Sequence, residues 1–165
     1  MCFRAVNRRG APDYDPALQR HHILPRQVQT RPCFRPMLTA IGPDRLCFDD
    51  FRRNGLLLPA NDDAALRVGL PLHRGPHRSY NEMVIERFGQ IEQGWAVQRL
   101  RAPEAALHDA LERLELLQRA LRRRLLDQQR RLRLNRNDPL GIGIDFTELD
   151  AMAEQLWPLV DPGPS

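Results

Sequence analysis

The sequence predicts an α+β fold that is mostly helical, and two observations lead to this prediction. Residues 21–100 hold more than half of the prolines and glycines together with four of the five histidines, which indicates short elements separated by turns. From residue 103 onward, leucines recur at intervals of three or four, which is typical of a long amphipathic helix. We therefore expect a small α+β core in residues 1–100 and a helical appendage in residues 101–165.

The elements expected in residues 1–100 are short. Residues 1–20 are basic and rich in turn-forming residues, so we expect them to be loosely structured. Asn54-Gly55 is a hairpin-turn signal, and the apolar run 56–58 after it predicts a strand that leaves a hairpin. A helix is expected from about residue 76 to residue 88, where apolar residues recur at helical spacing, and Gly89 is expected to end it.

The leucine-rich region predicts one helix over residues 103–134. Such a helix would be ~48 Å long, whereas a compact chain of this length is ~40 Å across. We therefore expect the helix to kink, or to project and pair with another helix, and a homodimer through residues 103–134 is one form of such pairing. Segment 145–157 is expected to form a shorter acidic helix at the C-terminal end.

The charge of the chain is unevenly distributed. The chain has 25 basic residues, all of them Arg, and 21 acidic residues. The arginines concentrate in residues 1–60 and 101–136, whereas the charged residues of 137–165 are all acidic. Two basic blocks favour a polyanionic partner, nucleic acid first. A genome rich in G and C, which replaces Lys with Arg throughout, explains the Arg usage as well, so the charge supports a nucleic-acid partner without establishing one.

Several classes of protein are disfavoured. No apolar run approaches the ~18–20 residues of a membrane span, and no apolar signal segment follows the first residues. We therefore expect no membrane association and a cytoplasmic protein, unless a specialised system exports it. The three cysteines are far apart and no Cys-x-x-Cys occurs, which argues against a disulfide framework and against a thiolate zinc finger.

The histidines form two tight clusters. His21 and His22 are adjacent in an extended segment, which places their rings on opposite sides of the chain. His73 and His77 are separated by Gly75-Pro76, so we expect His73 in a loop and His77 in the first turn of a helix. Either cluster alone is a weak metal signal, but together they favour a site in which three imidazoles leave coordination positions open. The fifth histidine, His108, is expected to be solvated.

The sequence around these histidines resembles a known family. The similarity rests on four motifs in residues 20–88, which are RHHILP at 20–25, FD at 48–49, NGLLLP at 54–59 and GLPLHRGPHRSYN at 69–81. In this order they resemble the AHH nucleases, a family of the HNH/endonuclease VII superfamily of ββα-metal enzymes that is frequent among bacterial toxins. Arg20 stands where the family has the alanine of its name.

The resemblance implies a small ββα-metal core that binds one divalent ion, Mg²⁺, Mn²⁺ or Zn²⁺. His21 would be a metal ligand, and His77 a second ligand carried by a helix. His73 would be a further ligand or a phosphate contact. His22 would be the general base that activates water, and Asn54 on the second strand would orient this base.

Other residues would support the reaction. The resemblance implies supporting roles for Tyr80 and Asn81, for which core packing and a polar helix surface are the plain alternatives. Arginines near the site could hold flanking phosphates, and they are Arg20, Arg26, Arg74 and Arg78.

The function expected from these observations is a metal-dependent endonuclease that hydrolyses phosphodiester bonds of DNA or RNA. Aromatic residues make up 6% of the chain, too few for extensive base stacking, so we expect little sequence specificity. The resemblance further implies a toxin role with an immunity protein as partner. Two alternatives stay open: a nucleic-acid-binding module with a structural metal, and a helix-mediated interaction protein with an inactive nuclease core.

Overall fold

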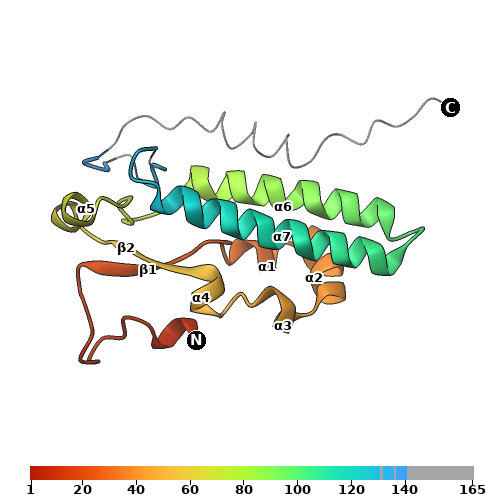
Figure 1. Ribbon diagram of the computed structural model, residues 1–165, viewed down its shortest axis with the longest axis horizontal. Helices are drawn as coiled ribbons and strands as arrows, with labels where there is room; N and C mark the ends of the chain where they lie inside the picture. Colours follow the sequence, from red (N-terminus) through yellow and green to blue (C-terminus); the bar gives the residue numbers. More distant parts are fainter. Residues whose placement is uncertain (131, 136, 141–165) are drawn as a thin grey trace.

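The computed structural model describes residues 1–130, 132–135 and 137–140. It confirms an α+β fold that is mostly helical, with two long helices lying side by side over a small sheet and several short helices (Figure 1). In chain order the elements are η1 (Phe3–Ala5), β1 (Leu18–His22), α1 (Gln27–Thr30), η2 (Pro32–Phe34), α2 (Arg35–Ile41), α3 (Pro43–Leu46), α4 (Phe51–Asn54), β2 (Gly55–Pro59), α5 (Asp62–Val68), α6 (Arg78–Gln98) and α7 (Pro103–Leu126).

The sheet consists of β1 and β2, which pair antiparallel with His21 opposite Leu56 and His22 opposite Gly55. The strand expected at 56–58 is confirmed, but the hairpin is wrong, because residues 23–54 with four short α-helices connect the two strands. Gly55 has φ −121°, whereas the expected turn needs a positive value. Glycine is required there for another reason: a Cβ atom would lie 2.2 Å from Cδ2 of Phe51.

Helix α6 continues ten residues beyond its expected end at residue 88. Gly89 does not end it, because the apolar spacing goes on with the buried residues Ile91 and Trp95. A Cβ atom on Gly89 would lie 3.9 Å from the ring of Phe34, so this glycine lies where η2 packs against α6. Burial of one continuous apolar face outweighs the low helix propensity of a single glycine.

Helix α7 ends at Leu126, eight residues before its expected end. The carboxylate of Asp127 accepts hydrogen bonds from the backbone N–H groups of Gln129 and Arg130 and so turns the chain. Figure 1 shows α7 running back along α6. The helix therefore pairs with a neighbour in the same chain, and its leucine stripe, for which a homodimer was one expected partner, packs into the protein's own core. Segment 145–157 lies outside the described residues.

The N-terminal segment is ordered, contrary to our expectation. Phe3 is buried, and its N–H donates to the carbonyl of Asp49. The side chain of Asn7 bonds the backbone of Asp15 and Leu18, which fixes the loop that leads into β1. The buried ring of Phe3 and the amide side chain of Asn7 thus hold the N-terminal segment in place, although its composition is typical of a loop.

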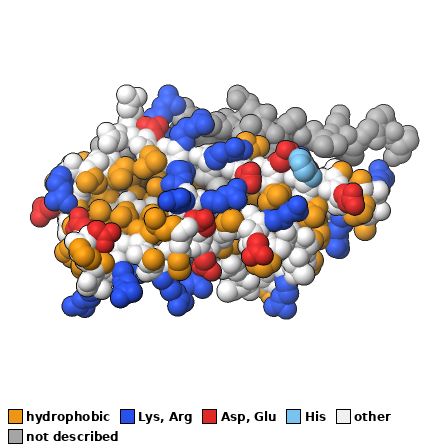
Figure 2. All heavy atoms as spheres, turned by 60° about the horizontal axis from the view of Figure 1, so that its bottom comes forward, with side chains coloured by type: hydrophobic (Ala, Val, Ile, Leu, Met, Phe, Trp, Pro, Cys, Tyr) orange, Lys and Arg blue, Asp and Glu red, His pale blue; other side chains and the backbone are white. Residues whose placement is uncertain are grey.

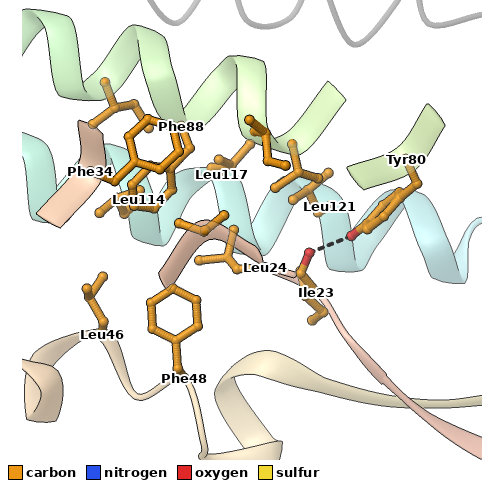
Figure 3. Close-up of a cluster of buried hydrophobic side chains, with 14 of the residues drawn as sticks. Ile23, Leu24, Phe34, Leu46, Phe48, Tyr80, Phe88, Leu114, Leu117 and Leu121 are labelled. Carbon is orange, nitrogen blue, oxygen red and sulfur yellow. Dashed lines mark hydrogen bonds between the residues drawn. The ribbon is translucent and has the colours of Figure 1, made fainter. Parts of the chain in front are cut away.

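One hydrophobic core joins the small elements to the long helices. Figure 3 shows Leu24 and Phe48 beneath Phe88 of α6 and Leu114 of α7, all in one cluster. The division of the chain into a core of residues 1–100 and an appendage of residues 101–165 stays a prediction. The hydrophobic core contains residues from both of these parts. None of the helices in the described part of the chain combines the length and the apolar character that a membrane span needs.

We predict that Leu121→Ala lowers the free energy of unfolding by about 2–5 kcal/mol, because Leu121 is fully buried between the long helices and the rest of the core. Leu126→Ala is the matched control, since Leu126 is 44% exposed on the same helix and its loss should cost less than about 1 kcal/mol. Urea unfolding followed by circular dichroism measures both. If both substitutions lowered the free energy of unfolding equally, Leu121 would not be part of a core shared by the long helices and the small elements.

Candidate active site

His21 lies at the centre of the candidate site. Strand alternation turns its side chain toward α6, where it is 3% exposed. Its ring centroid lies 4.9 Å from that of His73, 5.5 Å from that of His77 and 5.1 Å from that of Tyr80. The two histidine clusters, about fifty residues apart in sequence, therefore meet at one point, as the sequence predicts.

The loop between α5 and α6 brings His73 and His77 to His21. The N–H of His73 donates to the carbonyl of Pro59, which attaches the loop to the end of β2. Gly75 has φ +80°, a backbone conformation that favours glycine, and it lets the chain reverse between the two histidines. His73 lies in the loop as expected, and His77 directly precedes the first residue of α6. The ring centroids of His73 and His77 are 4.3 Å apart.

The nitrogens of these three rings fit a metal ion. One nitrogen from each of His21, His73 and His77 lies within 4.8 Å of the others. Nε2 of His21 and Nδ1 of His77 are buried and have no hydrogen-bond partner within the described part of the protein. Nδ1 of His73 lies 3.2 Å from Oε1 of Gln19, an arrangement that leaves Nε2 of His73 free to coordinate. A divalent cation would accept the lone pairs of these converging ring nitrogens in place of hydrogen-bond donors.

Burial keeps the rings in the neutral form that binds metals. Burial and the nearby rings of His73 and His77 hold the pKa of His21 well below 6.5. Burial, with a smaller effect of His77, lowers the pKa of His73 to about 4. Burial also lowers the pKa of His77. Since a protonated imidazole cannot coordinate a cation, the cluster is ready for a metal at neutral pH.

His22 lies on the opposite side of β1 and outside the cluster. Its ring stacks on Phe3 with centroids 3.6 Å apart and planes inclined by 10°. Nε2 of His22 is buried without a hydrogen-bond partner in the described residues. Burial lowers the pKa of His22, Arg26 and Arg20 add to this effect, and Asp49 opposes it. The adjacent histidines thus have separate surroundings, as the sequence predicts.

Asn54 is fully buried and supports the backbone that follows His22. It lies at the end of α4 rather than on the second strand, where we expected it. Its side chain accepts the N–H of Leu24 at 2.7 Å and donates to the carbonyls of Leu24 and Phe48. Its own carbonyl accepts the N–H of Ile23. These bonds hold the chain one and two residues beyond His22.

The remaining predicted residues lie around this centre. Tyr80 is buried, and its hydroxyl donates to the carbonyl of Ile23 at 2.7 Å (Figure 3), while burial raises its pKa. Asn81 is half-buried on the first turn of α6, and Arg74 is exposed in the His73 loop. The guanidinium of Arg20 donates to the carbonyls of Phe3 and Arg4, so it holds the N-terminal segment.

Asp138 and Gln19 also support the site and were not identified from the sequence. Asp138 is buried and accepts the N–H of Leu72, the residue before His73, at 2.9 Å. Gln19 bonds the ring of His73 from β1. Asp138 is one of six acidic residues after position 136, and no local pattern distinguishes it from the others. The alternation of β1 places Gln19 on the same side as His21, a signal that could have identified it.

An antiparallel pair of strands and a following helix that bring three imidazoles together are the arrangement expected of a ββα-metal nuclease. A family model described as a nuclease family of the HNH/ENDO VII superfamily with conserved AHH matches residues 3–121. Because the match covers well over half of the chain, the protein belongs to this AHH family. It extends into α7, beyond the motifs at 20–88. No curated protein and no solved structure gives a match.

We predict that Asp138→Ala lowers the free energy of unfolding by about 1–3 kcal/mol, because it leaves the buried N–H of Leu72 without an acceptor. Loss of this support should also weaken Zn²⁺ binding by about tenfold or more in a calorimetric titration. Asp138→Asn keeps an acceptor oxygen and should retain most of the affinity. Asp109→Ala, which removes a half-buried carboxylate that pairs with Arg113 on α7, is the control, and equal Zn²⁺ affinity in all four proteins would contradict this role.

We predict that the metal-free protein loses stability as the pH falls from 6.5 toward 4. The folded state holds the pKa of His73 at about 4, whereas the unfolded chain has the ordinary value of 6.5, so the unfolded state binds more protons in this window. Acid therefore favours unfolding. Urea unfolding at several pH values should show a shallower pH dependence for His73→Ala than for the unaltered protein. A pH dependence identical in His73→Ala and the unaltered protein would contradict the prediction.

Proposed function

We propose that the protein is a metal-dependent endonuclease that hydrolyses phosphodiester bonds of DNA or RNA with low sequence specificity. One observation carries the proposal: three neutral imidazoles converge with unpartnered nitrogens, and the adjacent His22 presents a fourth neutral ring outside the cluster. Membership of a nuclease family supports the same chemistry.

His21, His73 and His77 would hold the divalent ion through one nitrogen each. When bound, such an ion stabilises the negative charge that develops on the phosphate oxygens during hydrolysis. Three protein ligands leave coordination positions for substrate, which is typical of catalytic and not of structural sites. Gln19 would keep the proton of His73 on Nδ1 and so direct Nε2 toward the centre.

His22 would accept the proton of the attacking water. Its lowered pKa means that the ring is unprotonated at neutral pH and has a lone pair available. Stacking on Phe3 fixes the plane of the ring, and the bonds from Asn54 fix the backbone just beyond it. Asn54 therefore acts as a positioning residue through the chain at Leu24, since its side-chain bonds go to the backbone of Leu24 and Phe48.

Substrate recognition would depend on phosphates more than on bases. Arg74 and Arg78 are exposed next to His73 and His77 and could contact phosphates that flank the scissile bond. Phosphate contacts carry no sequence information, which supports low specificity. A toxin role with an immunity protein rests on the family alone, and expression of the chain in bacteria with and without an adjacent candidate gene would test it.

The experiment that tests the proposal is cleavage of plasmid DNA and total RNA with Mg²⁺, Mn²⁺ or Zn²⁺ added, with and without chelator. We expect cleavage that the chelator abolishes and the metal restores. A nucleic-acid-binding module with a structural metal would shift the mobility of the substrate without producing fragments. Bound metal and intact substrate under all conditions would overturn the proposal.

We predict that His22→Ala lowers the cleavage rate by about 10²–10⁴-fold, because the general base is lost. Zn²⁺ affinity measured by calorimetry should stay unchanged, since His22 lies outside the three-ring cluster. His108→Ala, an exposed histidine on α7, is the matched control and should cleave at the normal rate. Wild-type cleavage by His22→Ala with its metal retained would show that His22 is not the base.

A further inference from the structure

We propose that a groove between α4 and α7 is a second phosphate-binding site, which holds the backbone of the nucleic acid apart from the histidine cluster. The inference rests on the proposed function for its ligand, but its evidence is a separate set of residues. The groove has a volume of 220 Å³. Its lining residues are Arg52, Arg53, Glu115, Gln118, Arg119 and Arg122.

The groove carries an excess of positive charge. Four guanidinium groups face one carboxylate, that of Glu115, which pairs with Arg53 at 2.8 Å. Within the described part of the chain, neither Arg52 nor Arg119 has an ion pair within 4 Å, and both side chains are exposed. Besides the N-terminal ammonium, the charge of Arg52 acts on the carboxylate of Asp50 and helps to lower its pKa. Figure 2 shows basic side chains gathered near the centre of one face of the molecule. Like charges held together at a groove attract an anion of more than one charge.

The side chain of Arg122 lines the groove and is held in place by hydrogen bonds to the backbone. Its Nη2 group donates to the carbonyls of Arg52, Arg53 and Gly55, at 2.7, 3.2 and 3.1 Å. These bonds join α7 to the junction of α4 and β2 and orient the guanidinium, so that Arg52 and Arg119 stand on a rigid base. Partial burial lowers the pKa of Arg122, which means that its charge is incompletely solvated and that an anion would stabilise it.

Phosphodiesters fit this chemistry better than other anions. A guanidinium presents parallel N–H donors that match two oxygens of one phosphate, and the two exposed groups of Arg52 and Arg119 suit successive phosphates of a strand. The position of the groove suits a substrate strand as well. Gly55, whose carbonyl Arg122 holds, is opposite His22 in the sheet, and paired residues in an antiparallel sheet have Cα atoms ~5 Å apart. One strand of nucleic acid that reaches His22 therefore passes close to the groove.

The test removes the two unpaired cations and measures binding. Arg52→Ala/Arg119→Ala is compared with Arg45→Ala/Arg101→Ala, which removes two exposed arginines outside the groove. Binding to a short DNA duplex is measured across a range of salt concentrations with chelator present, so that the duplex stays intact. Hydrolysis of bis(p-nitrophenyl) phosphate, a substrate too small to span both sites, measures the histidine centre on its own.

We expect the groove variant to bind the duplex about tenfold or more weakly, and the slope of log affinity against log salt to fall by ~1.8, at ~0.9 per lost phosphate contact. The control pair should lower affinity by less than about threefold. Glu115→Gln removes the one carboxylate among the described residues that line the groove, and it should raise the affinity. Hydrolysis of the small substrate should be the same in all variants.

If the groove pair and the control pair weaken duplex binding equally, the proposal is overturned. The loss of any two positive charges would then explain the lower affinity. Unchanged duplex binding by the groove variant would also overturn the proposal. The groove would then be a candidate binding site for an acidic protein and not for nucleic acid. Failure of the proposed function is a different result: the unaltered protein would then bind the duplex through the groove but hydrolyse neither the duplex nor the small phosphodiester when metal is added.

Discussion

The packing of His21 against His73 and His77 in a buried site is the interaction on which the rest of the structure depends. A buried polar nitrogen without a partner costs about 1–3 kcal/mol, and among the residues that the structure describes, Nε2 of His21 and Nδ1 of His77 are two such nitrogens in this site. A bound cation would offset this cost, and the three converging imidazoles are a group of residues that could hold one. Burial also suppresses protonation, so the burial that leaves these nitrogens without partners also keeps the rings in the neutral form that can bind a metal.

Strand alternation at residues 21 and 22 would separate the two tasks that the proposed function assigns to these histidines, and these tasks need opposite conditions. A ligand has to commit its lone pair to the cation, whereas a base has to keep its lone pair for a proton. Adjacent residues on β1 meet both needs, because His21 faces α6 and His22 faces Phe3. A register shift of one residue between β1 and β2 would exchange the two rings. The bonds of Asn54 to Leu24 and of Tyr80 to Ile23 oppose such a shift directly after the pair.

The sequence predicted the mostly helical α+β class, because the leucine stripe is a local pattern. It predicted the meeting of the histidines because four of them lie in two tight clusters whose motifs resemble those of a known family. It failed where a distant contact decides the local structure. Asn54-Gly55 reads as a turn, but the glycine is needed for the close approach of Phe51. Gly89 reads as a helix end, but the apolar face of α6 continues to Trp95. Asp138 bonds Leu72 across 66 positions, and no pattern in one sequence encodes that pairing.

Helix α7 connects the groove to the candidate active site through a rigid path. Its leucines enter the core, while Gln118 and Arg122 reach the α4–β2 junction from the side. Nε2 of Gln118 donates to the side-chain oxygen of Asn54 that also accepts the N–H of Leu24. The residues that line the groove thus share hydrogen bonds with the residue that supports His22. A substrate phosphate in the proposed groove site would lie near the proposed base His22, and binding there would help to orient the scissile bond.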